Sequence, residues 1–366
     1  MSEYQYYEFR AIDRPLSEAE QREIGKLSSR VDLTPSKAVF VYNYGDFRGD
    51  PEEVLSRYFD ASLYLANWGS RRLMFRFPKA MIDLEEVRPY CVTDHISFSV
   101  AGEHVILDIE LDKEEGVDWL EGEGWLPSLL GLREDILRQD YRLLYLAWLG
   151  ATMLVYDLDE DAHEPPVPPG LRVLSAALGN FVDLFELDKD LLKVAAQASG
   201  ERQEVSQGAL QQALSRLPEA ERDTFLLRLA RGEANLSAAL NRRLYELAGV
   251  TRDAAQPRRT VKQLRRAAEG ARAEEKKKRA QEAERQRLKA LSELSQREEQ
   301  VWQEVDGLIR QKQAKAYEEA VGRLLRLRDL AACKEKKTAF EERLRRLREQ
   351  HSRLPALQRR LDKAGL

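Results

Sequence analysis

The stretch RAEEKKKRAQEAERQR, residues 272–287, sets the strongest limit on how this chain can fold. It contains almost no side chain that a protein core could bury. A helix here must depend on good helix propensity and on charge pairs four residues apart, such as Glu274 with Lys278. We therefore expect a long charged helical arm that stands clear of the rest of the chain.

The arm and the rest of the sequence also differ in net charge. Residues 1–250 carry 27 Lys and Arg against 44 Asp and Glu, whereas residues 251–366 carry 32 against 19. The net charge of −4 therefore hides an acidic body and a basic tail. A chain of 366 residues is long enough for two or three domains.

The sequence also indicates the cellular compartment of the protein. Only two cysteines occur, Cys91 and Cys333, too few for a disulfide framework or a multi-cysteine zinc site. The start MSEYQYYEFRAIDRPLS lacks the basic and apolar regions of a secretion signal. The longest apolar run, residues 143–156, is shorter than the ~20 residues that span a bilayer. We expect a cytoplasmic protein with no membrane contact.

Strand and helix patterns alternate in the first 115 residues. Strands are expected at 4–12, 37–44, 62–68 and 71–77, helices after Ser17 and after Asp50-Pro51, and a further hairpin around Ala101-Gly102. This order predicts an α+β fold with a mixed sheet. The strand order does not follow from the sequence.

Helical periodicity starts past residue 115 and is interrupted by the proline-rich connector EPPVPPGL at 164–171. Apolar residues near heptad spacing after Leu288 predict a short coiled-coil or hairpin contact. The expected domains are an α+β domain at 1–115, a helical domain at 116–250, and a basic helical arm ending in a helical hairpin at 251–366.

The hairpin at 62–77 offers the first candidate site. With Gly69-Ser70 as a two-residue loop, Trp68 would face Arg71 in a cross-strand cation–π pair that holds the hairpin together. This interpretation gives both side chains a structural role.

The opposite face of that hairpin would carry Asn67, Arg72 and Arg76. Guanidinium groups match planar oxyanions, so these three residues are candidates for binding an anion or an acidic partner segment. Asp46, Asp50 and Asp60 on flanking segments are alternative partners within the chain.

A dense basic cluster follows at the start of the arm, made of Arg258, Arg259, Lys262, Arg265 and Arg266. Phosphate contacts need charge and little else, so the cluster is a candidate nucleic-acid site. Because no aromatic residue interleaves with the arginines, base stacking is not indicated. The alternative is a solvated helix start or a surface that docks on the acidic body.

The residues expected of an enzyme or a metalloprotein are sparse. No phosphate-binding glycine motif precedes a helix, and the four histidines never stand at ligand spacing. Cys91 and Asp94 near His95 form a weak catalytic candidate. We predict no cofactor and no metal.

Three stretches, EYQYYEFRAIDRPLS, RYFDASLYLANWGSRRLMFRFPK and EPPVPPGL, resemble a widespread group of uncharacterised bacterial proteins over roughly the first 200 residues. That resemblance implies no activity. The C-terminal residues from 316 onward resemble helical tails of some bacterial proteins with a SWIM-type zinc finger, although the zinc motif is absent. This second resemblance implies assembly with other proteins and no metal.

The hypothesis from sequence is a non-enzymatic cytoplasmic interaction or scaffold protein of a bacterial multi-protein system. It would bind a protein partner through its helical arm, with oligomerisation through the C-terminal helices also considered. A nucleic-acid-binding factor that uses residues 258–266 is one alternative. An enzyme with its site in the α+β domain near Arg72, Arg76 and His95 is another.

Overall fold

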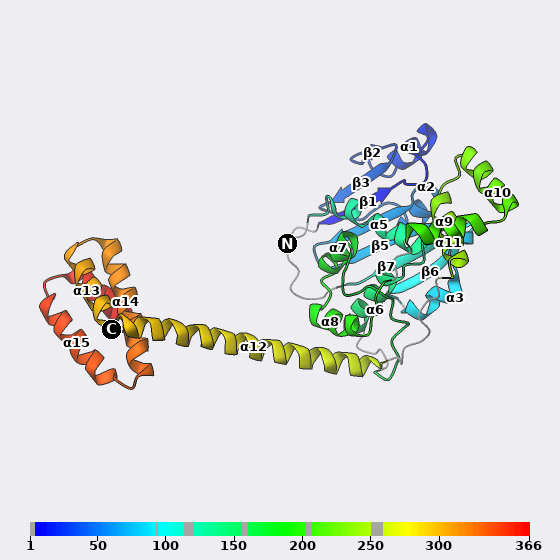
Figure 1. The fold of residues 1–366 in the computed structure, drawn as a ribbon. Coiled ribbons are helices and arrows are strands. Elements are labelled where there is room, and N and C mark those ends of the chain that lie inside the picture. Colours follow the sequence, from blue (N-terminus) through cyan, green and yellow to red (C-terminus); the bar gives the residue numbers. More distant parts are fainter. Residues whose placement is uncertain (1–3, 93, 113–120, 155–159, 203–205, 250–258) are drawn as a thin grey trace. The chain divides into compact units, whose positions relative to one another are not determined.

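The computed structural model describes residues 4–92, 94–112, 121–154, 160–202, 206–249 and 259–366. The chain forms two compact units, unit 1 from Met1 to Ala271 and unit 2 from Arg272 to Leu366 (Figure 1). The predicted three-part division at 115 and 250 differs from this grouping. The reason is that the middle helices bury their apolar faces on the sheet and share its core.

Unit 1 is built on a seven-stranded sheet with the order β2-β3-β1-β4-β5-β7-β6. The strands are β1 Gln5–Arg10, β2 Asp32–Thr34, β3 Lys37–Tyr42, β4 Ala61–Ala66, β5 Arg71–Pro78, β6 Ile96–Ala101 and β7 His104–Glu110. Every strand pairing in the described residues is antiparallel. The α+β class is confirmed, with an antiparallel sheet in place of the mixed sheet that the sequence predicted.

Helices cover both faces of this sheet (Figure 1). The helices of unit 1 are α1 Glu18–Gly25, α2 Pro51–Tyr58, α3 Leu84–Val87, α4 Trp125–Leu129, α5 Gly131–Leu137, α6 Arg142–Leu154, α7 Ala176–Leu184, α8 Lys189–Gln197, α9 Gln207–Arg216, α10 Glu219–Ala230 and α11 Leu236–Leu247. Short 3₁₀ turns lie at Lys79–Met81 and Arg88–Tyr90.

The alternation of strand residues decides which helices pack where. Leu73 and Phe75 of β5 join a core with helices α4 to α8. Met74, between them, points to the other face and joins Ile24 of α1 and Leu55 of α2. Because successive side chains of a strand point to opposite faces, one strand serves both cores.

The β4–β5 hairpin has a different register from the predicted one. Leu65 lies opposite Arg71, and the backbone N–H of Ala66 donates to the carbonyl oxygen of Ser70 over 2.9 Å. The loop is therefore three residues long and ends at Gly69, whose φ of 108° lies in the region that glycine adopts without strain. A two-residue loop at Gly69-Ser70 does not form, and Trp68 lies in the loop.

The capping box predicted at the start of α1 is confirmed. The Ser17 hydroxyl accepts from the backbone N–H of Glu20, and a Glu20 carboxylate oxygen accepts from the backbone N–H of Ser17 over 2.7 Å. The guanidinium of Arg14 and the Ser17 backbone together lower the pKa of Glu20 to about 2.

We expect this cap to weaken in acid. Since the pKa of Glu20 is lower in the folded chain than its ordinary value of 4.5, its contribution to stability is complete above 4.5 and is lost as pH falls towards 2. Carboxyl-carbon NMR of Glu20 should show a titration midpoint well below 4.5. A midpoint at 4.5 would contradict the cap.

Helix α12, Val261–Gln296, runs from unit 1 into unit 2. Its first turns belong to unit 1, because Val261, Leu264 and Ala268 are buried in the core that the sheet shares with helices α4 to α8. The first turns of the predicted arm thus belong to the same compact unit as the sheet.

Unit 2 is a small helical bundle with its own core. Its helices α13 Glu298–Arg310, α15 Lys337–Gln350 and α16 Pro355–Lys363 all contact α14 Ala314–Cys333. Trp302 and Val305, predicted from heptad spacing, are buried in this core, whereas Leu288 is 49% exposed. The predicted helical hairpin is therefore part of a bundle.

Candidate functional site

The three candidate anion-binding residues of the hairpin all have partners within the chain. Arg72 donates from Nε and Nη2 to the carboxylate of Asp108 over 2.9 and 2.6 Å. Arg76 donates from Nη2 to Oδ1 of Asp60 over 2.7 Å and from Nη1 to the carbonyl of Ser56. Asn67 accepts from the backbone N–H of Tyr4 over 3.0 Å. These side chains tie strands together, as the sequence alternative with Asp60 anticipated.

Arg71 makes a different contact from the predicted cation–π pair with Trp68. Arg71 is only 4% exposed, and its Nη2 lies 2.6 Å from Oε1 of Glu186, beyond α7. Trp68 is 46% exposed in the hairpin loop. The three-residue loop explains the difference, since it moves Arg71 opposite Leu65. Arg71 thus joins the sheet to the helical layer.

A buried carboxylate, that of Asp60, lies directly before the central strand β4 and beside Arg76 of β5. Asp60 is 1% exposed and accepts from the backbone N–H groups of Ile12 and Asp13 over 2.6 and 2.9 Å. Burial alone would raise the pKa of Asp60, but these N–H groups and the Arg133 and Arg76 guanidiniums lower it. Asp60 therefore stays charged and binds donors from several elements.

Arg133 of α5 completes what we call the Asp60 cluster: Asp13, Asp60, Arg76 and Arg133. Its Nη1 and Nη2 donate to the carboxylate of Asp13 over 2.9 and 2.8 Å, and its Nε donates to the carbonyl of Arg76. The sequence patterns did not single out Arg133. The signal was an arginine within the apolar run LPSLLGLREDIL, whose side chain had to find a buried partner.

A second buried cluster, the arm anchor, consists of Tyr145, Glu164 and Arg259. Glu164 is 1% exposed, and Nε and Nη2 of Arg259 donate to its two oxygens over 2.8 and 3.0 Å. The Tyr145 hydroxyl donates to Glu164 over 2.9 Å. Burial, followed by the charge of Glu164, raises the pKa of Tyr145, so the phenol remains a donor.

Three residues of the predicted nucleic-acid cluster have partners within the chain. Arg259 pairs with Glu164, Lys262 lies 2.8 Å from Glu160, and Arg265 donates to the carbonyl of Thr152. Arg266 is exposed, and Arg258 lies outside the described residues. These contacts match the alternative in which the cluster docks on the acidic body.

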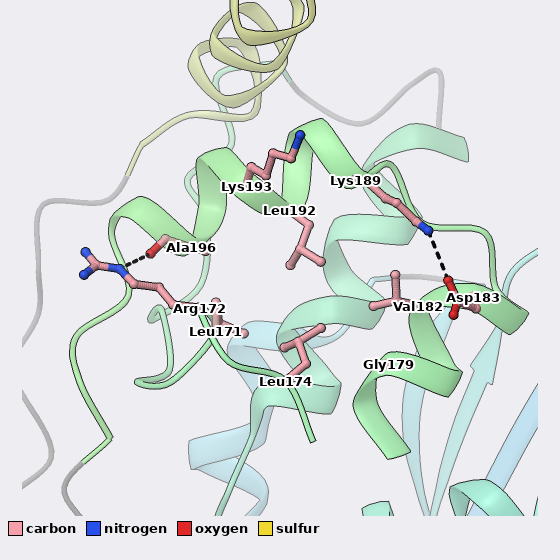
Figure 2. Close-up of a pocket in the computed structure, with 10 residues that line it drawn as sticks. All are labelled: Leu171, Arg172, Leu174, Gly179, Val182, Asp183, Lys189, Leu192, Lys193 and Ala196. Carbon is pink, nitrogen blue, oxygen red and sulfur yellow. Dashed lines mark hydrogen bonds and ion pairs between the residues drawn. The ribbon is translucent and has the colours of Figure 1, made fainter. Parts of the chain in front are cut away.

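A shallow pocket of about 340 Å³ lies between α7, α8 and the segment before α7 (Figure 2). Its lining consists of Leu171, Arg172, Leu174, Gly179, Val182, Asp183, Lys189, Leu192, Lys193 and Ala196. Figure 2 shows Arg172 and Lys189 turned to partners at the rim, Ala196 O and Asp183. Among these lining residues there is no Ser, Cys or His, so the pocket offers no hydroxyl or thiol nucleophile paired with an imidazole base.

The weak catalytic candidate near Cys91 is not set up for nucleophilic chemistry. Partial burial raises the pKa of the Cys91 thiol, so the thiolate is scarce at neutral pH. The Nδ1 atom of His95 lies 3.0 Å from the carbonyl oxygen of Glu110. Within the described ranges, no group of three His, Cys, Asp or Glu side chains is placed to hold a metal ion.

The middle of α12 presents the most extended exposed surface of the described chain. All fifteen residues from 276 to 290, here called the exposed segment, are exposed to solvent. They carry seven Lys and Arg against Glu282 and Glu284. At 1.5 Å per residue, the segment is about 22 Å long. It is thus a long basic surface of a single helix.

Comparisons with protein families, with curated proteins and with solved structures find no match to this chain. In the described residues, every helix falls short of the length or the apolar character that crossing a bilayer requires.

Proposed function

We propose that this chain is a non-enzymatic interaction protein that binds the acidic surface of a protein partner through the exposed segment of α12. The observation that carries the proposal is the run of fifteen exposed residues with a net charge of +5. A helix that buries no apolar face there has no role in either core. Its main feature is charge that faces outward, which suits a complementary protein surface.

The charge pattern favours a protein over a nucleic acid as the partner. Glu282 and Glu284 lie within the exposed segment, and Glu275 pairs with Arg279 over 2.7 Å at its start. Carboxylates repel a phosphate backbone, whereas they can pair with cations on a mixed protein surface. Two residues of the predicted nucleic-acid cluster, Arg259 and Lys262, are paired within the chain.

The cytoplasm and a bacterial multi-protein assembly remain part of the proposal. Cys91 and Cys333 are both free, which suits a reducing compartment. Unit 2 forms its own core at the end of α12, so it can present a further surface to the same assembly.

The proposal is tested by neutralising the lysine run of the exposed segment. The triple variant Lys276→Gln, Lys277→Gln, Lys278→Gln should retain about tenfold less protein partner, since each exposed ion pair contributes roughly 0.2–1 kcal/mol. The measurement is co-purification from nuclease-treated extract of cells that naturally produce the protein, quantified by mass spectrometry.

The matched control changes the same three lysines to arginine. Arginine and glutamine are both good helix formers, so α12 should persist in both variants, and circular dichroism can confirm this. The arginine variant should keep the partner. Equal retention by both variants argues against the exposed segment, and loss of every partner after nuclease treatment favours the nucleic-acid alternative.

A further inference from the structure

The pocket between α7 and α8 is an open apolar groove on the surface of unit 1. In Figure 2 the side chains of Leu174, Val182 and Leu192 point toward one another across it. Val182 is buried, whereas both leucines are only half-buried. Of the ten lining residues, three are buried, and the other seven remain in contact with water. The apolar floor of the groove is therefore accessible from outside.

Three cations stand at the rim of this groove. Residues 143–201 contain only three Lys and Arg, namely Arg172, Lys189 and Lys193, and all three line it. Among the lining residues that the structure describes, Asp183 is the only acidic one. The charge at the rim thus opposes that of residues 1–250, in which 44 Asp and Glu outnumber 27 Lys and Arg. A positive rim on an acidic body favours a negatively charged ligand.

The present partners of the two lysines compete weakly for them. Nζ of Lys189 lies 3.3 Å from Asp183, and Nζ of Lys193 lies 3.4 Å from Asp190. The two lysine side chains are 74% and 58% exposed, and exposed ion pairs contribute little. Arg172 donates from Nε to a carbonyl oxygen in the last turn of α8 over 3.3 Å, which holds its guanidinium beside the groove (Figure 2). A further carboxylate can therefore approach all three cations.

We propose that this groove binds an acidic segment of a partner protein. One or two large apolar side chains of the segment would pack on Leu174 and Leu192, and its carboxylates would pair with the cations at the rim. Burial of the apolar side chains supplies most of the affinity, and the rim selects for negative charge. The groove lies on α7 and α8, so this inference does not depend on the exposed segment of α12.

A peptide fits this groove better than a small carboxylate ligand does. The volume of about 340 Å³ is near the lower end of the range for ligand pockets, which bury most of the surface of their ligand. A groove with seven of its ten lining residues open to water leaves much of a small ligand exposed. A peptide needs to insert only one or two side chains, and its backbone can stay in solvent.

Fluorescence anisotropy with the purified full chain tests the proposal. The probe is a fluorescein-labelled synthetic peptide of about eight residues, in which leucines stand between pairs of glutamates. We expect a dissociation constant on the order of 100 µM. Peptides with serine in place of the leucines, or with glutamine in place of the glutamates, should each bind about tenfold more weakly or worse.

Gly179 offers a matched pair of variants in the groove itself. A Cβ atom added at Gly179 meets no atom within 4 Å, so Gly179→Ala and Gly179→Leu should both fold. Each also removes a glycine from the interior of α7, which favours the helix. The leucine side chain takes space at the groove and should weaken binding about tenfold, whereas alanine should change it less than about twofold. Circular dichroism and thermal unfolding check that both variants are folded.

Charge variants separate the groove from the basic surface of α12. The double variant Lys189→Gln, Lys193→Gln should weaken binding several-fold, and arginine at both positions should keep it. The variant with Lys276, Lys277 and Lys278 changed to glutamine should bind the probe as the wild type does. No binding up to about 1 mM, equal binding by the two α7 variants, or a loss of binding in the α12 variant would each overturn the proposal. Displacement of the probe by decanoate below the dissociation constant of the probe would also overturn it, since the groove would then be a small-ligand site.

Discussion

Replacing Arg259 by alanine is expected to lower the unfolding free energy of unit 1 by about 3–5 kcal/mol. The substitution removes the bidentate guanidinium from the carboxylate of Glu164, which is 1% exposed. That carboxylate keeps the Tyr145 hydroxyl and the backbone N–H of residue 259 as donors. An uncompensated buried charge costs far more than the loss of an exposed ion pair.

Two further variants separate this effect from a general change in charge. Arg266→Ala removes an exposed arginine from the first turns of α12, close in sequence to Arg259, and should change stability by less than about 0.5 kcal/mol. Glu164→Gln should cost less than Arg259→Ala, because the Arg259 side chain is 25% exposed and can reach water.

Urea denaturation gives the free energies, and hydrogen-exchange mass spectrometry locates the effect. Exchange should rise in the first turns of α12 near Val261 and Leu264 for Arg259→Ala, with no change around Val305 in unit 2. If Arg259→Ala and Arg266→Ala prove equal in stability, the arm anchor does not hold the start of α12.

Asp60→Ala is the second substitution with a large expected effect, again about 3–5 kcal/mol. It removes the acceptor of two backbone N–H groups, at Ile12 and Asp13, and leaves the guanidinium of Arg76 buried at 8% exposure. The expected loss of stability is large because these buried groups are shielded from water, and the substitution removes their carboxylate partner.

Asp50 provides a matched comparison for Asp60. Its carboxylate also accepts from two backbone N–H groups, at the start of α2, but it is exposed and pairs with no arginine in the described residues. Asp50→Ala should therefore cost about 1 kcal/mol, the usual value of a helix N-cap. Thermal and urea unfolding of both variants would reveal the difference. A cost for Asp60→Ala as small as that for Asp50→Ala would mean that burial adds nothing to this cluster.

Local sequence patterns predicted the local structure well. The capping box at Ser17 and the Asp50-Pro51 start of α2 are found as expected, because their partners lie within a few residues. The α+β class followed from the order of these elements. Strand β2, Asp32–Thr34, was missed because three residues are too few for alternation to show.

Long-range pairings could not be predicted in the same way. Arg133 and Asp13 are 120 residues apart, and Arg259 and Glu164 are 95 apart. The identity of an arginine does not reveal which distant carboxylate it meets, so the basic cluster at 258–266 had two open interpretations. The hairpin register depended on whether the loop held two or three residues, and GlySer after Trp68 suited both.

The sequence also did not reveal which apolar residues the fold leaves exposed. The exposed leucines of α10 lie in the stretch whose helical periodicity predicted the helical domain at 116–250. In the structure the helix ends at Ala230, and Asn235, with a φ of 60°, directly precedes the next helix, α11. Periodicity predicts a helix, but not whether the chain itself covers its apolar side.

Site-specific photocrosslinking in cells that naturally produce the protein can detect contact between the middle of α12 and a protein partner. A photoreactive residue at Gln281, in the exposed segment, is compared with one at Ala19, exposed on α1. We expect a discrete protein adduct from position 281 that survives nuclease, is absent from position 19, and is reduced when Lys276, Lys277 and Lys278 are changed to glutamine. No protein adduct from position 281, or an adduct that nuclease removes, would contradict the proposed contact.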